Sequence, residues 1–306
     1  MPGFEDIFRI EQRGAINPAA VLLRPASPIS PSLRGPLCLR NAELDVAIAE
    51  AVAVLSSMTP LSLASVIQPV NRAMARAEFS VDLHWRDDLQ RLYGLLVAQY
   101  AHTRLSVREK RELRDRVVNG KSAKVSTPIN RGDEIDDMWT EAGGSDKARD
   151  DDRFWCAAFV YHCHLTAATM LGGETTCPRT TWAGGMWHGN SKLNTRWTKA
   201  QVLATREETI RPGDVFVFDG KNGGEITTGK FFSGHTGLVT RVTRSPQARN
   251  NDAVAIDTIE GNTNTGGSRD GDGVYLRTDR FANKRVYGFV RPRLRFPWCA
   301  KAEPIK

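Results

Sequence analysis

The sequence predicts an α+β protein in which helices come first and a sheet follows. Between residues 41 and 171 apolar residues recur at intervals of three and four, the spacing of helices with one buried face. After residue 211 short alternating segments between glycine-rich turns predict about five antiparallel strands. A run of helices followed by a run of strands is typical of the α+β class.

The first part of the chain predicts a proline-rich linker and a small helical domain. Repeated prolines favour an extended conformation over residues 25–37. Four helical segments are expected after it, near residues 41–60, 61–79, 85–96 and 106–120. Pro69 predicts a break or kink in the second helix, and a capping box at Ser106 predicts the start of the fourth. We expect residues 1–124 to form this domain, whose role the sequence does not reveal.

Residues 151–171 predict a helix with a cysteine in its first turn. Two aspartates give a start signal, an apolar stripe follows, and glycines end the segment. Unpaired backbone N–H groups at a helix N-terminus favour a thiolate over a thiol. Cys156 is therefore a candidate nucleophile, although small buried cysteines are also common in protein cores.

A histidine and two polar residues follow at the ends of predicted strands. His235 opens one apolar segment, and Glu260 and Asn262 close another. Cysteine, histidine and a polar third residue, in this order, form the papain-type arrangement of nucleophile, general base and ring-orienting group. A carboxylate would also stabilise the imidazolium, whereas an amide could only orient the ring. The sequence leaves open which of the two contacts His235.

Six short motifs extend this pattern into a family resemblance. They are FWCAAFV, RPGDVFVF, GHTGLV, IEGNTN, DGVYLRTDR and VYGFVRPR. These motifs resemble those of the CHAP family, which is similar to the NlpC-type peptidases, and they cover roughly residues 125–306. The resemblance implies a papain-like fold with helices packed on the sheet, and a cysteine amidase or endopeptidase that cuts peptidoglycan peptides. It also implies that Glu260 and Asn262 are both polar partners of His235.

Several residues are candidates for substrate contacts. Trp182 and Trp187 lie in a loop-rich segment and could stack on a sugar ring or hold a peptide, although tryptophans more often cover a core. Trp155 and Gly234 adjoin the candidate nucleophile and base and complete this set. The backbone N–H of Cys156 would contribute to an oxyanion hole.

No metal ion or other cofactor is expected. His162 and His164 lie close to three other potential ligands in sequence, but on a helix they point about 200° apart and cannot face one ion. The acidic loop 262–273 lacks the ligand spacing of a calcium-binding loop. We expect Cys163 to be a core residue rather than a resolving thiol.

Composition excludes several classes of function. The net charge of +7 is spread along the chain, with 17 Lys and Arg against 13 Asp and Glu in residues 1–125, and this argues against a nucleic-acid-binding face. Five irregularly spaced cysteines do not predict a disulfide framework. No apolar run approaches the roughly 20 residues of a membrane span. Acidic residues near the N-terminus do not fit a signal peptide.

The CHAP resemblance implies a cysteine hydrolase of peptidoglycan, and the lack of a signal-peptide pattern leads us to expect that it is made in the cytoplasm and delivered to the periplasm or cell wall of a target bacterium. It would act as an antibacterial effector, a phage lysin or a tail enzyme. Its substrate partner would be a peptidoglycan peptide. Its protein partner would be a secretion machine, a phage tail or an immunity protein. The alternative is a papain-like protease or amidase that acts on a cytosolic protein of a target cell, because the catalytic residues alone do not identify the amide bond.

Overall fold

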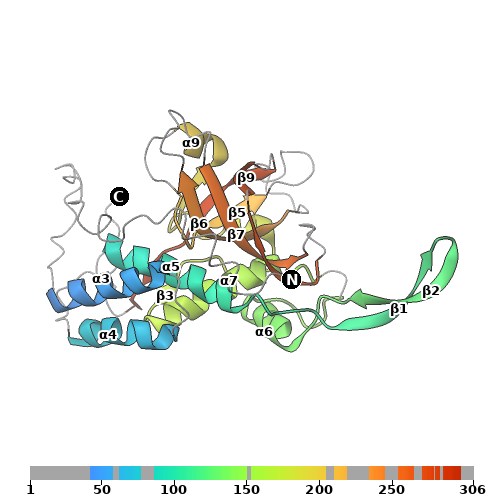
Figure 1. Ribbon diagram of the computed structural model, residues 1–306, viewed down its shortest axis with the longest axis horizontal. Helices are drawn as coiled ribbons and strands as arrows, with labels where there is room; N and C mark the ends of the chain where they lie inside the picture. The colour runs from blue at the N-terminus through green and yellow to red at the C-terminus, as the bar shows by residue number, and fades with distance from the viewer. Residues whose placement is uncertain are drawn as a thin grey trace.

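Helices and a sheet form two layers in the structure, a computed structural model of the chain (Figure 1). It describes residues 42–57, 62–76, 86–149, 153–204, 210–218, 234–244, 254–264, 271–278, 280–282 and 285–297. The predicted linker over residues 25–37, and also Cys38 and Cys299, lie outside these residues. The mixed architecture, with helices first and an antiparallel sheet after them, confirms the predicted α+β class.

Three N-terminal helices follow the predicted apolar stripes. They are α3 (Ala42–Ser56), α4 (Leu63–Arg76) and α5 (Asp87–Thr103). In α3 the buried residues are those of the predicted stripe: Leu44, Ala47, Ile48, Ala51, Val52 and Leu55. Helix α4 continues through Pro69, so the break, one of the two predicted outcomes, does not occur. Burial of Ile67 and Val70 on either side offsets the cost of about 3 kcal/mol that proline imposes inside a helix.

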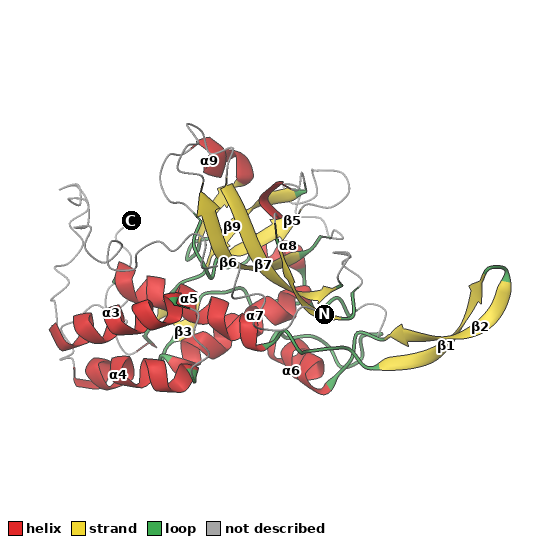
Figure 2. Ribbon diagram, in the orientation of Figure 1, coloured by secondary structure: helices red, strands yellow, loops and turns green. Residues whose placement is uncertain are grey.

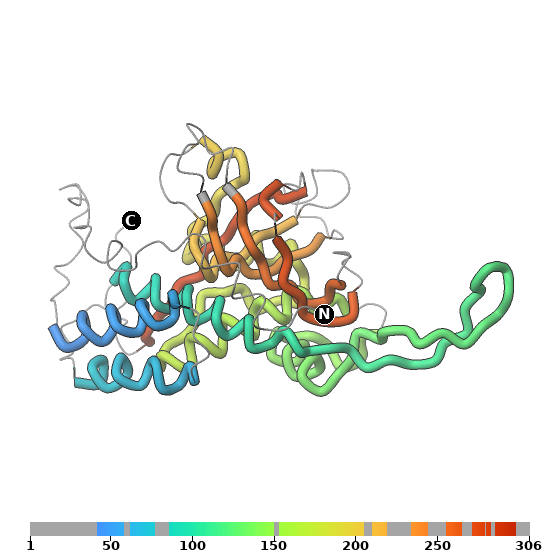
Figure 3. The backbone as a smooth tube through the Cα atoms, in the orientation of Figure 1, coloured from blue at the N-terminus to red at the C-terminus, as the bar shows by residue number. Residues whose placement is uncertain are grey.

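Residues 106–120 do not form the predicted helix. Instead, β1 (Arg111–Val118) and β2 (Lys121–Pro128) pair as an antiparallel hairpin. Asn119 and Gly120 at its tip have φ values of 51° and 76°, the positive values that a two-residue type I′ turn requires. This Asn-Gly turn signal outweighs the capping box at Ser106. Figure 3 shows that the hairpin projects well beyond the helices and the sheet.

The C-terminal sheet has six antiparallel strands in the order β4-β9-β5-β6-β7-β8. Their bounds are β4 (Thr195–Thr198), β5 (Val215–Phe218), β6 (Thr236–Arg244), β7 (Val254–Thr263), β8 (Gly273–Arg277) and β9 (Val286–Arg291). Five of them are the predicted strands. The sixth, β4, is an edge strand too short to give a clear alternation. A separate pair joins β3 (Glu174–Thr175) to β10 (Leu294–Arg295).

Helix α7 packs against α5 on one side and against β6 and β7 of the sheet on the other (Figure 2). The remaining helices are α6 (Asp133–Glu141), α7 (Cys156–Met170), α8 (Ala183–His188), α9 (Lys199–Ala204) and the 3₁₀ helix η6 (Arg280–Ala282). One hydrophobic cluster contains buried residues of α3, α5, α7 and the sheet. In the part of the chain that is described, no helix has both the length and the apolar character needed to cross a membrane.

The division into domains 1–124 and 125–306 stays a prediction, and two features bear on it. The boundary falls within β2, whose hydrogen-bonded partner β1 precedes it. Buried contacts also cross it: Tyr93 of α5 shares a hydrogen bond of 2.8 Å between its hydroxyl and Nδ1 of His164 in α7. We therefore expect residues 86–128 to contribute to the stability of the C-terminal part.

Candidate active site

Cys156 is the first residue of α7 and so lies in its first turn, as predicted, although the described residues 153–155 are not helical and the helix starts later than expected. Trp155 occupies the N-cap, and the aspartates expected to start the helix lie outside the described residues. Backbone N–H groups of a first helical turn lack acceptors within the helix and carry partial positive charge. Because Cys156 is only 3% exposed, this charge acts on the thiol with little screening by water.

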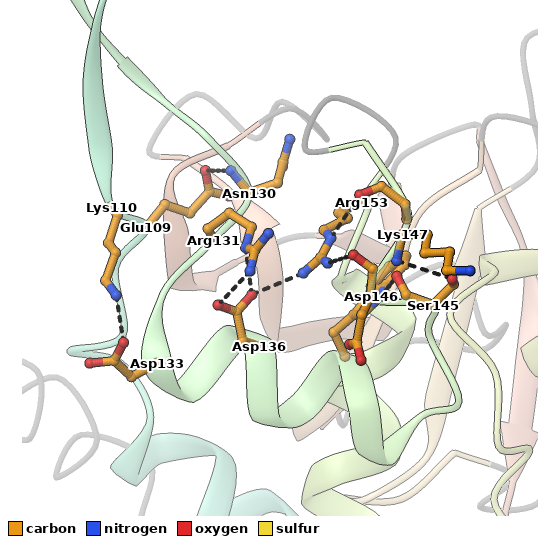
Figure 4. Close-up of polar contacts among 12 residues, drawn as sticks. Glu109, Lys110, Asn130, Arg131, Asp133, Asp136, Ser145, Asp146, Lys147 and Arg153 are labelled. Atoms are coloured by element: carbon orange, nitrogen blue, oxygen red, sulfur yellow. Dashed lines mark hydrogen bonds and ion pairs between the residues drawn. The ribbon is translucent and has the colours of Figure 1, made fainter.

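Two buried side chains hold the segment that leads into α7. Arg153 donates from Nη1 to Oδ1 of Asp136 at 3.0 Å, and Arg131 pairs with the same carboxylate at 2.9 Å (Figure 4). Trp155 donates its indole N–H to Oε1 of Glu109 at 2.8 Å. Burial raises the pKa of the Glu109 carboxyl. The start of α7 is thus fixed by contacts with α6 and with the segment before β1.

His235 lies immediately before β6, and its ring contacts Glu260 near the end of β7. Nε2 of His235 and Oε2 of Glu260 are 2.9 Å apart, and both side chains are buried. The two strands pair with Leu238 opposite Ile259, so the start of β6 meets the end of β7. The structure therefore places Glu260 in contact with the imidazole.

The other ring nitrogen of His235 faces a different environment. Nδ1 has no hydrogen-bond partner of ordinary geometry in the described part of the chain. Burial lowers the pKa of His235, but interactions with Cys156 and Glu260 raise it to about 9. The thiol therefore lies close enough to influence the ring. An imidazole that holds its proton at neutral pH beside a thiol can form a thiolate–imidazolium pair.

Glu260 is held by hydrogen bonds on both oxygens. Oε1 accepts from Oγ1 of Thr258 and from Nε of Arg280, each at 2.6 Å. Oε2 contacts His235 and accepts from Nη2 of Arg280 at 2.5 Å. Burial raises the pKa of this carboxyl, but His235 and Arg280 lower it to about 2. Glu260 is therefore an anion over the whole working range of pH.

Sequence reasoning missed both Thr258 and Arg280. Thr258 could have been found, because residues two apart on a strand share one face, and it precedes Glu260 by two. Arg280 lies in η6, and no local spacing connects it to the end of β7. It reaches the carboxylate only through the tertiary fold.

Asn262 is fully buried in β7, and its side chain makes no hydrogen bond to the ring of His235. Its φ of 54° is in the left-handed region, and the pairing of β7 with β8 shifts register between Glu260 and Thr263. Neither atom of its side-chain amide has a hydrogen-bond partner among the described residues. An unsatisfied buried polar group costs about 1–3 kcal/mol, so this amide is a destabilising feature of the site.

Trp155 differs from the other candidate substrate-binding residues in its burial. Its side chain has no exposed surface, and its indole N–H is bound to Glu109. It therefore supports α7 from within the core, and its contact with a substrate stays a prediction.

The other candidates are partly exposed. Trp182 stacks on His188 with ring centroids 6.2 Å apart, and Trp187 packs edge-on against Tyr287 at 4.9 Å. Gly234 directly precedes His235 and is also partly exposed. A role of these three residues in substrate binding stays a prediction.

The histidines of α7 bind protein groups. His162 contacts Glu141 at 2.6 Å and Tyr100 at 2.9 Å through its two ring nitrogens, while His164 contacts Tyr93. Across the described ranges, no three or more His, Cys, Asp or Glu side chains are grouped so that they could hold a metal ion.

The described cysteines are free thiols with different surroundings. Cys163 and Cys177 are almost completely buried, and burial raises the pKa of both thiols well above the ordinary value. Neither has the helix N-terminus or the histidine that Cys156 has. Among the described cysteines, Cys156 therefore has the surroundings that a nucleophile requires.

Comparison with known proteins gives one match to a protein family. The family model of the CHAP domain matches residues 148–262, which confirms the resemblance seen in the motifs. The matched segment includes Cys156, His235, Glu260 and Asn262, but not Arg280. No curated protein and no solved structure gives a significant match. CHAP domains are generally hydrolases that act on peptidoglycan.

Proposed function

We propose that this protein, in which residues 148–262 are a CHAP domain, is a cysteine-dependent hydrolase that cuts an amide bond in the peptide part of peptidoglycan. The observation that carries the proposal is the pair of His235 and Glu260 beside Cys156 at the N-terminus of α7. Its bond specificity would be that of an amidase or an endopeptidase.

The first half of the proposed reaction transfers the acyl group to the enzyme. The Cys156 thiolate attacks the carbonyl carbon of the amide, and backbone N–H groups at the start of α7 stabilise the oxyanion. His235 then gives its proton to the leaving amine as the C–N bond breaks. Glu260 holds Nε2 of the ring, so Nδ1 is left to transfer the proton. The product of this half is a thioester on Cys156.

The second half hydrolyses the thioester. His235, now neutral, takes a proton from a water molecule, and the resulting hydroxide attacks the thioester carbon. The acid product leaves as the C–S bond breaks, and the thiolate beside the imidazolium is restored. A bound substrate or water would provide the hydrogen-bond partner that the buried amide of Asn262 lacks.

The location of peptidoglycan extends the proposal to delivery. Its substrate lies outside the cytoplasm, so the enzyme would act in the periplasm or cell wall of a target bacterium, as an antibacterial effector, a phage lysin or a tail enzyme. A secretion machine or phage tail would carry it there, and an immunity protein would protect the producing cell from it.

Digestion of purified sacculi tests the chemistry directly. The wild-type protein should release soluble fragments that mass spectrometry identifies, and their new termini distinguish an amidase from an endopeptidase. Cys156→Ala and His235→Ala should release none, whereas Cys163→Ala, a change at a buried thiol on the same helix, should retain activity. Release by Cys156→Ala at the wild-type rate would refute the assignment. Cleavage of a protein substrate with sacculi left intact would favour the cytosolic alternative.

A further inference from the structure

We propose that Arg280 is a positioning residue that keeps the proton shared by His235 and Glu260 on the imidazole ring. The inference rests on the proposed function, because it gives Arg280 a part in preparing the Cys156 thiolate. Arg280 lies in η6, outside the segment that the family model matches, and it is 7% exposed.

The contact between Arg280 and Glu260 is bidentate. Nε donates to Oε1 at 2.6 Å and Nη2 donates to Oε2 at 2.5 Å, the fork geometry in which a guanidinium fits a carboxylate best. Thr258 and His235 occupy the remaining acceptor positions of the carboxylate. The guanidinium also lies 5.2 Å from the ring centre of Phe218 in β5. Arg280 is therefore held on one side by the carboxylate and on another by an aromatic ring.

The charges of the site balance only when Arg280 is counted. A thiolate, an imidazolium, a carboxylate and a guanidinium sum to zero. Without the guanidinium, a net negative charge would remain in a poorly solvated site, and burial favours neutral forms. The proton between His235 and Glu260 would then move toward the carboxylate. A neutral imidazole no longer stabilises the thiolate of Cys156.

Arg280 opposes this transfer by its position. It bonds both carboxylate oxygens directly but reaches the imidazole only through Oε2 of Glu260. A proton on Glu260 would therefore lie next to the guanidinium and would weaken its two bonds, because the carboxyl group would no longer be an anionic acceptor. A proton on His235 lies farther from the guanidinium and preserves both bonds. The closer cation thus directs the proton to the more distant group.

The remaining groups around the pair do not replace Arg280. From β5, Phe216 and Phe218 present rings whose centres are 6.3 and 6.1 Å from that of His235. From β6, Gly237 lies against the side chain of Glu260 and adds no charge.

Polar groups of β8 also approach this part of β7 but are bound elsewhere. Arg277, opposite Thr258 in the sheet, donates to the backbone oxygen of Asn264 at 3.4 Å. Tyr275, opposite Glu260, donates its hydroxyl to Asp272 at 2.7 Å.

The test measures the thiolate itself and needs no substrate. In a protein of residues 1–306 with Cys38 and Cys299 replaced by serine, iodoacetamide alkylation of Cys156 is followed by mass spectrometry as a function of pH, because only the thiolate reacts. Arg280→Met and Arg280→Gln should raise the pH midpoint of alkylation by about one unit or more. A shift of one unit corresponds to about a tenfold loss of thiolate at pH values below the midpoint. Arg280→Lys keeps the charge but not the fork and should give a smaller shift. Arg285→Met is the matched control, since Arg285 is exposed and its guanidinium lies 6.0 Å from the ring of Phe218.

Each outcome decides between the two proposals. Wild-type midpoints in Arg280→Met and Arg280→Gln would overturn the role of Arg280 and leave the proposed function standing. If Arg280→Met is unfolded by circular dichroism, the alkylation midpoint of Arg280→Gln decides the question instead. If both variants are unfolded, the proposed positioning role is rejected and Arg280 has a structural role only. If the wild-type protein itself shows a midpoint no lower than the value of an ordinary thiol, about 8.5, the proposed function fails.

Discussion

The indole N–H of Trp155 donates to Glu109 at 2.8 Å, so the residue before the candidate nucleophile is bound to the segment that leads into the hairpin. The other oxygen of Glu109 accepts the backbone N–H of Asn130 at 2.7 Å, just after the hairpin. One buried carboxylate therefore joins both ends of the hairpin to the start of α7. The position of Cys156 depends on residues that precede the segment matched by the CHAP-domain model.

Glu109→Ala should destabilise the protein. The change leaves the buried indole N–H of Trp155 and the backbone N–H of Asn130 without their acceptor, which should lower the free energy of unfolding by about 1–3 kcal/mol. Urea denaturation followed by tryptophan fluorescence measures the change. Glu112→Ala, at an exposed position on β1, is the control and should have little effect. Equal stability of the two variants would show that the contact with Trp155 contributes nothing.

The raised pKa of His235 predicts how activity depends on pH. The imidazolium that the reaction requires is lost as pH rises through about 9, so kcat/KM for peptide release should fall with a midpoint near that value. The same shift affects stability. Because the folded protein binds this proton more tightly than the unfolded chain, the stabilisation is complete below about pH 6.5 and is lost between about 6.5 and 9.

Glu260→Gln tests the cause of that shift. Removing the carboxylate removes one of the interactions that raise the pKa of His235, so the alkaline midpoint of kcat/KM should move to lower pH and kcat should decrease. Asp257→Asn is the control on the same strand, since Asp257 pairs with Arg241 rather than with His235. An unchanged midpoint in Glu260→Gln would mean that the carboxylate does not set the protonation of the ring.

The sequence predicts those parts of the site that depend only on the periodicity of a single helix or strand. The stripe of α7 fixes Cys156 in a first turn, and the alternation after residue 211 places His235 and Glu260 at strand ends. Which polar residue contacts the ring is decided by the register shift between Glu260 and Thr263, and a sequence pattern does not encode such a shift. The Arg280 contact likewise forms only when η6 packs against β7.

The error over residues 106–120 has a different origin. Charged residues at mixed intervals fit a solvated helix face as well as an exposed strand, and the capping box at Ser106 favoured the helix. Asn119 and Gly120 carried the opposite signal, because both tolerate the positive φ of a tight hairpin turn. Since nearly every residue of this hairpin is exposed, no buried face was available to distinguish the two periods.

Shortening the hairpin should leave the chemistry intact. Glu112 and Thr127 are register partners, so deleting residues 113–118 and 121–126 joins them through the original Asn119-Gly120 turn. The deleted residues are almost all exposed, and Glu109 and Asn130 keep their contacts. Release of peptide from sacculi should stay within about twofold of the wild-type rate, because surface changes away from buried contacts have small effects. A large loss of activity in a folded variant would assign the hairpin a part in binding the substrate.

Location should decide whether the enzyme is harmful. The proposed substrate is absent from the cytosol, so a Gram-negative host should tolerate expression of residues 1–306 there. Fusion of a secretory signal peptide should then cause rounding and lysis, measured by turbidity and microscopy, and Cys156→Ala and His235→Ala should abolish the effect. Cys163 and Cys177 are buried, which shields them from thiols outside the core, and serine at Cys38 and Cys299 removes other thiols that could pair with Cys156 in an oxidising compartment. Toxicity of the cytosolic form that requires Cys156 and leaves the sacculus intact would instead identify a cytosolic protein as the substrate.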